Sequence, residues 1–230
     1  MRKKFIFFLI TLAALSLRPE VLSAQRENAM EEELESLPIQ VSAEGERLAR
    51  MLDEFDVEHH WLAFEYVNWE TGDPQQRPES VKKSHCSSFV AVVAKKLGIY
   101  ILRPPQHSEE NLANAQNGWL EKYGREYGWE PVATALKAQE LANEGYLVVA
   151  SYENPNRHKP GHIAVVRPFT KSEAQIEEEG PQIIQAGEYN YNSTSVKVGF
   201  KEFPGKEVLY FFNDAVGQER RYLRCHPGAS

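Results

Sequence analysis

Apolar residues repeat along this chain with two different periods, one in the N-terminal half and one in the C-terminal half. Within residues 45–64 and 84–98 they recur every three or four positions, which is typical of amphipathic helices. In the second of these segments Ser84 is in a position to cap the start of the helix. The same period predicts further helices over residues 108–123 and 133–143.

After residue 145 the period becomes two, as expected for strands of a sheet. Turns rich in Pro, Gly and Asn separate the segments. The expected strands cover residues 146–152, 162–167, 182–186, 194–200 and 207–212. Helices followed by an antiparallel meander indicate the α+β fold class, with N-terminal helices packed on an antiparallel sheet of about five strands.

A short basic stretch and an apolar segment open the chain. Residues 1–4 include Arg and two Lys, and residues 5–17 form a nearly unbroken apolar run. Because this run is shorter than the roughly 20 residues that span a bilayer, and because Ser23 and Ala24 are small, we predict a signal peptide over residues 1–24. The protein is then secreted or periplasmic, with no stable membrane insertion after cleavage. An uncleaved membrane anchor is the alternative.

Downstream of that segment the composition separates a core from two polar ends. Residues 25–45 are polar and acidic, and we expect a mobile leader there. Residues 46–213 contain the periodic segments and are long enough for one domain. Residues 214–230 have no core pattern, so we expect a loose C-terminal tail. We expect the protein to be a monomer.

Composition and charge exclude several functions. The chain has 26 Lys and Arg against 33 Asp and Glu, a formal net charge of −7. Nucleic-acid binding usually needs a basic surplus, so we expect no nucleic-acid partner. Two cysteines exclude a disulfide scaffold and a Cys-rich zinc site, and His59 and His60 lack the His-Glu-x-x-His spacing of a zinc helix. We therefore expect no metal and no cofactor.

Three residues carry candidate chemistry. Cys86 lies in the first turn of a predicted helix, where unpaired N–H groups and the helix dipole should lower the pKa of its thiol below about 8.5. His162 opens an apolar strand directly after Pro160 and Gly161, which presents its side chain at the edge of the sheet. Gln185 interrupts the next apolar strand and can orient an imidazole. Taken singly, each also fits a structural role: a buried thiol, a hydrogen-bonded histidine and a solvent-facing amide.

The sequences around these three residues resemble a known family. The match consists of Cys-Ser-x-Phe-Val at residues 86–90, Gly-His-Ile-Ala-Val-Val at residues 161–166 and Ile-Gln-Ala at residues 184–186. Together they resemble the papain-like cell-wall amidases of the NlpC and CHAP groups. The resemblance implies a papain-like (NlpC/CHAP-like) core and a cysteine peptidase that hydrolyses amide bonds in peptidoglycan stem peptides without a cofactor.

Carried over residue by residue, the resemblance implies a Cys-His-Gln triad. Cys86 is then the nucleophile, with its backbone N–H in the oxyanion hole, His162 is the base, and Gln185 orients the imidazole. CHAP enzymes often place a Glu or Asn near the end of the strand that carries the third residue. Glu188 or Asn190 is therefore the alternative to Gln185.

Several functions stay open beside this one. A transferase or a deamidase uses the same triad. The neighbours His85 and Ser88 differ from the usual residues around the nucleophile, which leaves room for a catalytically silent binding module. A secreted toxin with the same chemistry also fits. The segment 103–130, rich in aromatic residues and Asn, either lines a substrate groove or packs as helices.

Overall fold

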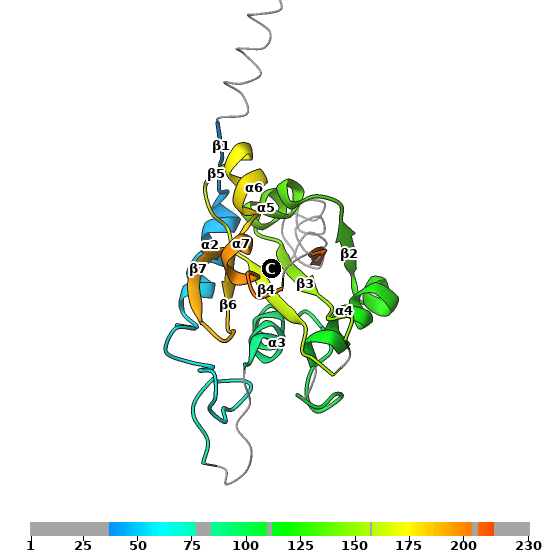
Figure 1. Cartoon of the computed structure of the whole chain (residues 1–230). Helices are drawn as coiled ribbons and strands as arrows, with labels where there is room; N and C mark the ends of the chain where they lie inside the picture. The colour runs from blue at the N-terminus through cyan, green and yellow to red at the C-terminus, as the bar shows by residue number, and fades with distance from the viewer. Residues whose placement is uncertain (1–36, 77–83, 110–111, 157, 204–206, 214–230) are drawn as a thin grey trace, which may run out of the picture. The chain divides into compact units, whose positions relative to one another are not determined.

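The computed structural model describes residues 37–76, 84–109, 112–156, 158–203 and 207–213 (Figure 1). The predicted signal peptide, most of the predicted leader and the predicted tail lie outside the described residues. The elements in chain order are β1 (Pro38–Ile39), α2 (Ala43–Asp53), α3 (Cys86–Lys96), α4 (Leu112–Tyr123), the 3-10 helix η1 (Gly124–Tyr127), β2 (Trp129–Val132), α5 (Ala135–Asn143), β3 (Leu147–Tyr152), β4 (His162–Val166), β5 (Lys171–Ser172), α6 (Glu173–Glu179), β6 (Gln182–Gln185), β7 (Tyr191–Ser195), α7 (Val196–Gly199) and β8 (Leu209–Asn213). This confirms the predicted α+β class.

The main sheet has six strands in the order β2-β8-β3-β4-β6-β7, and every neighbouring pair is antiparallel. The expected antiparallel sheet is therefore present, but the expected simple meander is wrong, because β8 returns to lie between β2 and β3. The extra strand is β2, which is only four residues long and contains Pro131. A strand this short shows little periodicity, and proline is tolerated there because β2 lies at the edge of the sheet.

Helices cover both faces of this sheet. On one face α3 and α4 pack against β3 and β4, and on the other α5 packs against β3, β4 and β8 while α7 packs against β6. Figure 1 shows α3 lying against the central strands. Alternate residues of β4 serve the two faces: Ile163 belongs to the core with α3, and Ala164 belongs to the core with α5. Because both faces are covered, β3 and β4 read as almost continuous apolar runs.

The start of α3 differs from the prediction in one respect. The helix begins at Cys86 with His85 in the N-cap position, and no side chain caps it. Ser84 is therefore not the cap that we expected. The Ser84 side chain instead forms a hydrogen bond with the Cys86 sulfur, and the His85 ring donates through Nε2 to the Glu65 carbonyl oxygen at 2.9 Å.

The strand predicted over residues 194–200 is only partly correct. β7 ends at Ser195, whose hydroxyl accepts a hydrogen bond from the backbone N–H of Val198 and caps the short helix α7. The alternation of apolar residues there matched a strand. A serine cap ends strand pairing at a single residue, which a period read over several residues does not resolve.

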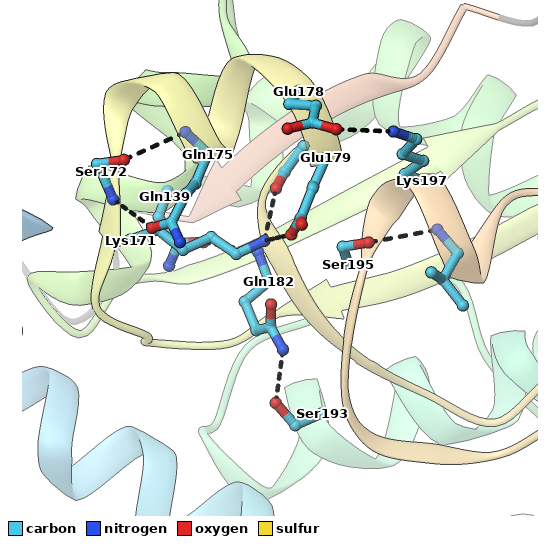
Figure 2. A network of polar contacts seen from close by, with 12 residues as sticks. Gln139, Lys171, Ser172, Gln175, Glu178, Glu179, Gln182, Ser193, Ser195 and Lys197 are labelled. Atoms are coloured by element: carbon cyan, nitrogen blue, oxygen red, sulfur yellow. Dashed lines mark hydrogen bonds and ion pairs between the residues drawn. The ribbon is translucent and has the colours of Figure 1, made fainter. Parts of the chain in front are cut away.

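Residues 173–179 form helix α6, an element that the periodicity of the sequence does not predict. Ser172 and Gln175 make a reciprocal capping box at its start. At its end the Lys171 ammonium donates to Glu179 and to the Gly180 carbonyl oxygen, each at 3.1 Å. Figure 2 shows these contacts. The cap and the ammonium satisfy the two helix ends, which explains why a segment this acidic is helical.

The last part of the predicted leader is anchored to the domain. β1 pairs with β5, and α2 begins at Ala43. The buried Asn143 side chain donates to the Ile39 and Phe169 carbonyl oxygens at 3.2 and 3.0 Å. Residues 38–45 thus have the hydrogen-bond partners that a mobile segment lacks.

Candidate active site

Cys86 is the first residue of α3, and its side chain is 4% exposed. Burial raises the pKa of the Cys86 thiol above its ordinary value, and this outweighs the lowering by the backbone N–H groups of Ile163, Ser87 and Cys86 itself and by the Ser84 side chain. The expectation of a lowered pKa is therefore wrong for this structure. The donors at the helix start are present, but removal of water from the sulfur has the larger effect.

His162 lies at the first position of β4, opposite Tyr152 of β3. The loop before it is held by amide side chains. Asn114 of α4 donates to the Lys159 carbonyl oxygen at 2.9 Å and accepts from the Asn154 N–H at 3.0 Å, and Asn154 donates to the Pro160 carbonyl oxygen at 3.1 Å. These bonds fix the chain direction directly before His162.

The structure brings His162 and Gln185 together. Nε2 of His162 lies 2.9 Å from Oε1 of Gln185, and both side chains are buried. The Gln185 amide nitrogen donates to the Tyr189 carbonyl oxygen at 3.1 Å, which turns the amide oxygen toward the ring. An amide oxygen only accepts, so Nε2 of His162 carries the proton and Nδ1 of the neutral ring carries the lone pair. Nδ1 is the nitrogen that can take a proton from a thiol.

Aromatic side chains hold the His162 ring on its other sides. The Phe200 ring lies edge-on with centroids 4.6 Å apart, and the Phe203 ring is stacked at 5.6 Å. Together with Gln185 they fix the orientation of the imidazole. Fixed orientation is what a general base needs, because proton transfer depends on distance and angle.

The two alternatives to Gln185 have other surroundings. The Asn190 side chain accepts from the Gly187 N–H and donates to the carbonyl oxygens of Val57 and His60. Glu188 is exposed and lines a cavity. Gln185 is thus the residue of the three whose side chain is hydrogen-bonded to His162.

The backbone of β4 connects the sulfur to the histidine. The Cys86 sulfur accepts a hydrogen bond from the N–H of Ile163, which follows His162 in the chain. Ser84, whose side chain also reaches the sulfur, lines the same cavity as His162. The start of α3 therefore lies against the start of β4.

A cavity of about 190 Å³ adjoins His162 and Gln185. Its walls combine aromatic rings with charged side chains, among them Tyr189, Tyr191, Phe203, Glu188 and Lys201. The Lys201 ammonium lies 5.0 Å from the centre of the Tyr189 ring. A cavity beside a hydrogen-bonded imidazole is a suitable binding place for part of a substrate.

Aromatic residues of segment 103–130 pack around Tyr100. Trp119 and Tyr127 lie 5.0 Å apart, and each contacts the Tyr100 ring. Trp129, the first residue of β2, is buried and donates to the Tyr100 carbonyl oxygen at 2.7 Å. These contacts correspond to the packing alternative for this segment. His59 is exposed and bonded to Asp56, and Cys225 lies outside the described residues.

Comparison with known proteins adds no relative. No family model matches the chain, and no curated protein matches it. Over the described ranges, no group of three or more His, Cys, Asp or Glu side chains is arranged to hold a metal ion. In the same part of the chain, no helix has both the length and the apolar character needed to cross a membrane.

Proposed function

We propose that this protein is an exported cysteine amidase with a papain-like core that hydrolyses amide bonds in the stem peptides of peptidoglycan. The observation that carries the proposal is the hydrogen bond between His162 and Gln185 beside a cavity, with the Cys86 sulfur at the N–H of the next residue of β4. Such a pair is the base and orienting residue of a cysteine nucleophile. The substrate class comes from the resemblance of the three motifs.

The reaction has two halves. Nδ1 of His162 takes the proton of the Cys86 thiol, and the sulfur attacks the amide carbonyl carbon, while the Cys86 N–H donates to the developing oxyanion. The C–N bond breaks, the imidazolium gives its proton to the departing amine, and a thioester remains on Cys86. Water then attacks the thioester carbonyl carbon as His162 takes its proton, the C–S bond breaks to release the carboxylic acid, and the imidazolium returns the proton to the Cys86 sulfur.

The raised pKa of the thiol has a consequence for this mechanism. Burial raises the pKa of the Cys86 thiol and so favours its neutral form before substrate binds. Proton transfer to His162 must therefore accompany substrate binding or attack, rather than precede them as a stable ion pair. An acyl acceptor other than water would make the same enzyme a transferase, since the thioester is common to both reactions.

A binding module without catalysis is the second candidate, and the burial of Cys86 favours it. Cys86 is only 4% exposed, whereas reactive thiols usually lie in partially exposed environments. The two candidates differ in one respect that can be measured. Both bind wall peptide, but only the amidase changes it.

The test uses purified cell-wall sacculi and detects released peptides by mass spectrometry. The unmodified chain should release soluble fragments with new amine and carboxyl termini. Cys86→Ala should abolish release, since no nucleophile remains, whereas Cys225→Ala, the other cysteine of the chain, should leave it unchanged. Release that persists in Cys86→Ala would remove Cys86 from the nucleophile role. Binding of sacculi by the unmodified chain without any release would support the silent module.

A further inference from the structure

Asn190 joins two segments that are far apart in the chain. Its Oδ1 accepts from the Gly187 N–H at 2.9 Å, within the turn that follows β6. Its Nδ2 donates to the carbonyl oxygens of Val57 and His60 at 2.7 and 2.8 Å, and more weakly to that of Trp61 at 3.3 Å. One amide thus holds the turn after β6 against the segment that follows α2.

The segment after α2 has an unusual backbone. Asp56, Trp61 and Phe64 have φ angles of +46°, +51° and +65°, although none of them is glycine. This conformation costs free energy for residues with a side chain, and it persists where other contacts enforce it. Asn190 supplies such contacts, because its amide nitrogen donates hydrogen bonds to the carbonyl oxygens of Val57 and His60 in this segment.

The turn held by Asn190 is also the turn that orients Gln185. The Gln185 amide nitrogen donates to the carbonyl oxygen of Tyr189, the residue directly before Asn190. If this carbonyl moves, the Gln185 amide loses the partner that keeps its oxygen toward Nε2 of His162. The chain of contacts therefore runs from Asn190 through the turn to Gln185 and then to the imidazole.

We propose that Asn190 is a positioning residue that keeps His162 in the Nε2-protonated tautomer by fixing the turn that orients Gln185. The inference rests on the function proposed above in so far as His162 is the base. Asn190 is not one of the residues that line the cavity, and its side-chain hydrogen bonds go to backbone groups of Gly187, Val57 and His60. It acts through the backbone and not on the substrate.

The chemistry requires an amide at this position. The Gly187 N–H needs an acceptor, while the carbonyl oxygens of Val57 and His60 need a donor. Aspartate has nearly the same shape but only accepts when ionised. Asn190→Asp therefore keeps the bond to Gly187, removes both donors, and places a carboxylate against two carbonyl oxygens.

The first experiment measures the His162 tautomer by nitrogen NMR of the imidazole ring in the whole chain. The unmodified protein should show the neutral ring protonated on Nε2, and Asn190→Asp should show a mixture of both tautomers. Its kcat on wall peptide should fall about 10- to 100-fold with KM changed less than threefold, because the base is misoriented while the cavity is intact. An unchanged tautomer in a folded Asn190→Asp would overturn the proposal.

The matched control is Asn192→Ala. Asn192 accepts from the Val57 N–H at 3.1 Å, so it anchors the same strained segment without contacting the turn at Gly187. This variant should lose stability while its His162 tautomer stays unchanged. If Asn192→Ala changes the His162 tautomer ratio as much as Asn190→Asp does, release of strain in the segment after α2 explains the effect by itself. The proposal is then wrong.

A double variant tests the route through Gln185. In a Gln185→Ala background, adding Asn190→Asp should change the His162 tautomer ratio and kcat less than twofold. The side chain that connects the turn to the imidazole is already absent in that background. Additive effects would contradict the proposal. If the chain hydrolyses no wall peptide, the tautomer measurements still decide the role of Asn190 separately from the proposed function. Should Asn190→Asp fail to fold, Asn190→Ser is used, because its shorter side chain cannot span both segments.

Discussion

The two ends of strand β6 carry the same residue in different surroundings. Gln182 begins the strand and Gln185 ends it, and both side chains are buried. The Gln182 amide donates to the Ser193 hydroxyl at 2.7 Å, as Figure 2 shows. The Gln185 amide is bonded to the imidazole of His162, beside a cavity.

The difference shows what separates a structural amide from one at a candidate site. Both side chains satisfy their buried polar atoms, so both stabilise the fold. At the Gln182 end the partner is a hydroxyl, which keeps its proton throughout the physiological range. At the Gln185 end the partner is an imidazole, whose second ring nitrogen can accept a proton, and a cavity adjoins it. The partner and the adjoining space, not the glutamine, distinguish the two ends.

Among changes to the partners of the two glutamines, removing the imidazole should give the largest effect on activity. His162→Gln should lower kcat/KM by about 10³-fold or more, because a general base contributes about 10² to 10⁴ and the neutral amide cannot take a proton. Ser193→Ala, which removes the partner of Gln182, should leave kcat/KM within about threefold. Steady-state kinetics on wall peptide check both variants. Similar losses of kcat/KM in His162→Gln and Ser193→Ala would show that the two ends of β6 do not differ in function.

Exchanging the two glutamines for alanine sharpens the comparison. Gln185→Ala should lower kcat/KM about 10- to 100-fold, since the ring loses its fixed tautomer. Gln182→Ala should leave kcat/KM nearly unchanged. Each should reduce the free energy of unfolding by about 1 to 3 kcal/mol through lost buried hydrogen bonds. Urea unfolding and kinetics on the same samples separate the two effects, and a loss of activity in Gln182→Ala would contradict the assignment.

Two glycines near these ends allow a smaller perturbation. A Cβ atom at Gly199 would lie 2.5 Å from Oε1 of Gln185, so Gly199→Ala should displace the amide and lower kcat/KM about tenfold. An alanine at position 180, where φ is +75°, would place its Cβ 2.8 Å from the Cβ of Val196. Gly180→Ala should therefore reduce stability without reducing kcat/KM. Melting temperature and kcat/KM are measured for both variants. Equal kcat/KM in the two would contradict the prediction that only Gly199→Ala disturbs the candidate site.

The smallest effect concerns the Cys86 thiol, which lies at the Gln185 end. Its pKa is raised by burial in the folded state, so between the unfolded and folded pKa values the native protein holds more protons than the unfolded chain. The contribution of this thiol to the free energy of unfolding is then constant below about pH 8.5 and falls as the pH rises above it, by at most about 1.4 kcal/mol per pH unit. Unfolding at pH 7 to 10 should show this decline in the unmodified chain and a shallower decline in Cys86→Ala. Equal slopes would contradict a raised pKa.

Most of the long elements were predictable because their periodicity is a local property. α3, α4, α5, β3, β4, β6 and β8 lie within a few residues of the expected segments. The elements that the sequence did not predict have a common cause. The edge strand β2, the helix α6 and the change from β7 to α7 depend on single caps, on short length or on a lysine held at a helix end. Hydrophobic periodicity averages over several residues and does not detect such contacts.

The candidate site was predictable in its residues but not in its electrostatics. His162 and Gln185 stand out as polar side chains in apolar strands, and the antiparallel order placed their strands side by side. The choice of Gln185 over Glu188 and Asn190 depends on where the turn after β6 points each side chain, which its sequence does not specify. The pKa of Cys86 was predicted in the wrong direction, because helix position is visible in the sequence and burial of the sulfur is not.

By itself, the sequence determined the fold class, the approximate extent of the long elements and the three side chains of the candidate site. These follow from residue type and from spacing along the chain. Only the tertiary structure decided that one of two similar glutamines meets an imidazole, that an asparagine ties the neighbouring turn to a distant strained segment, and that the thiol is buried. Such features depend on which segments the fold brings together and on how much water it removes from them.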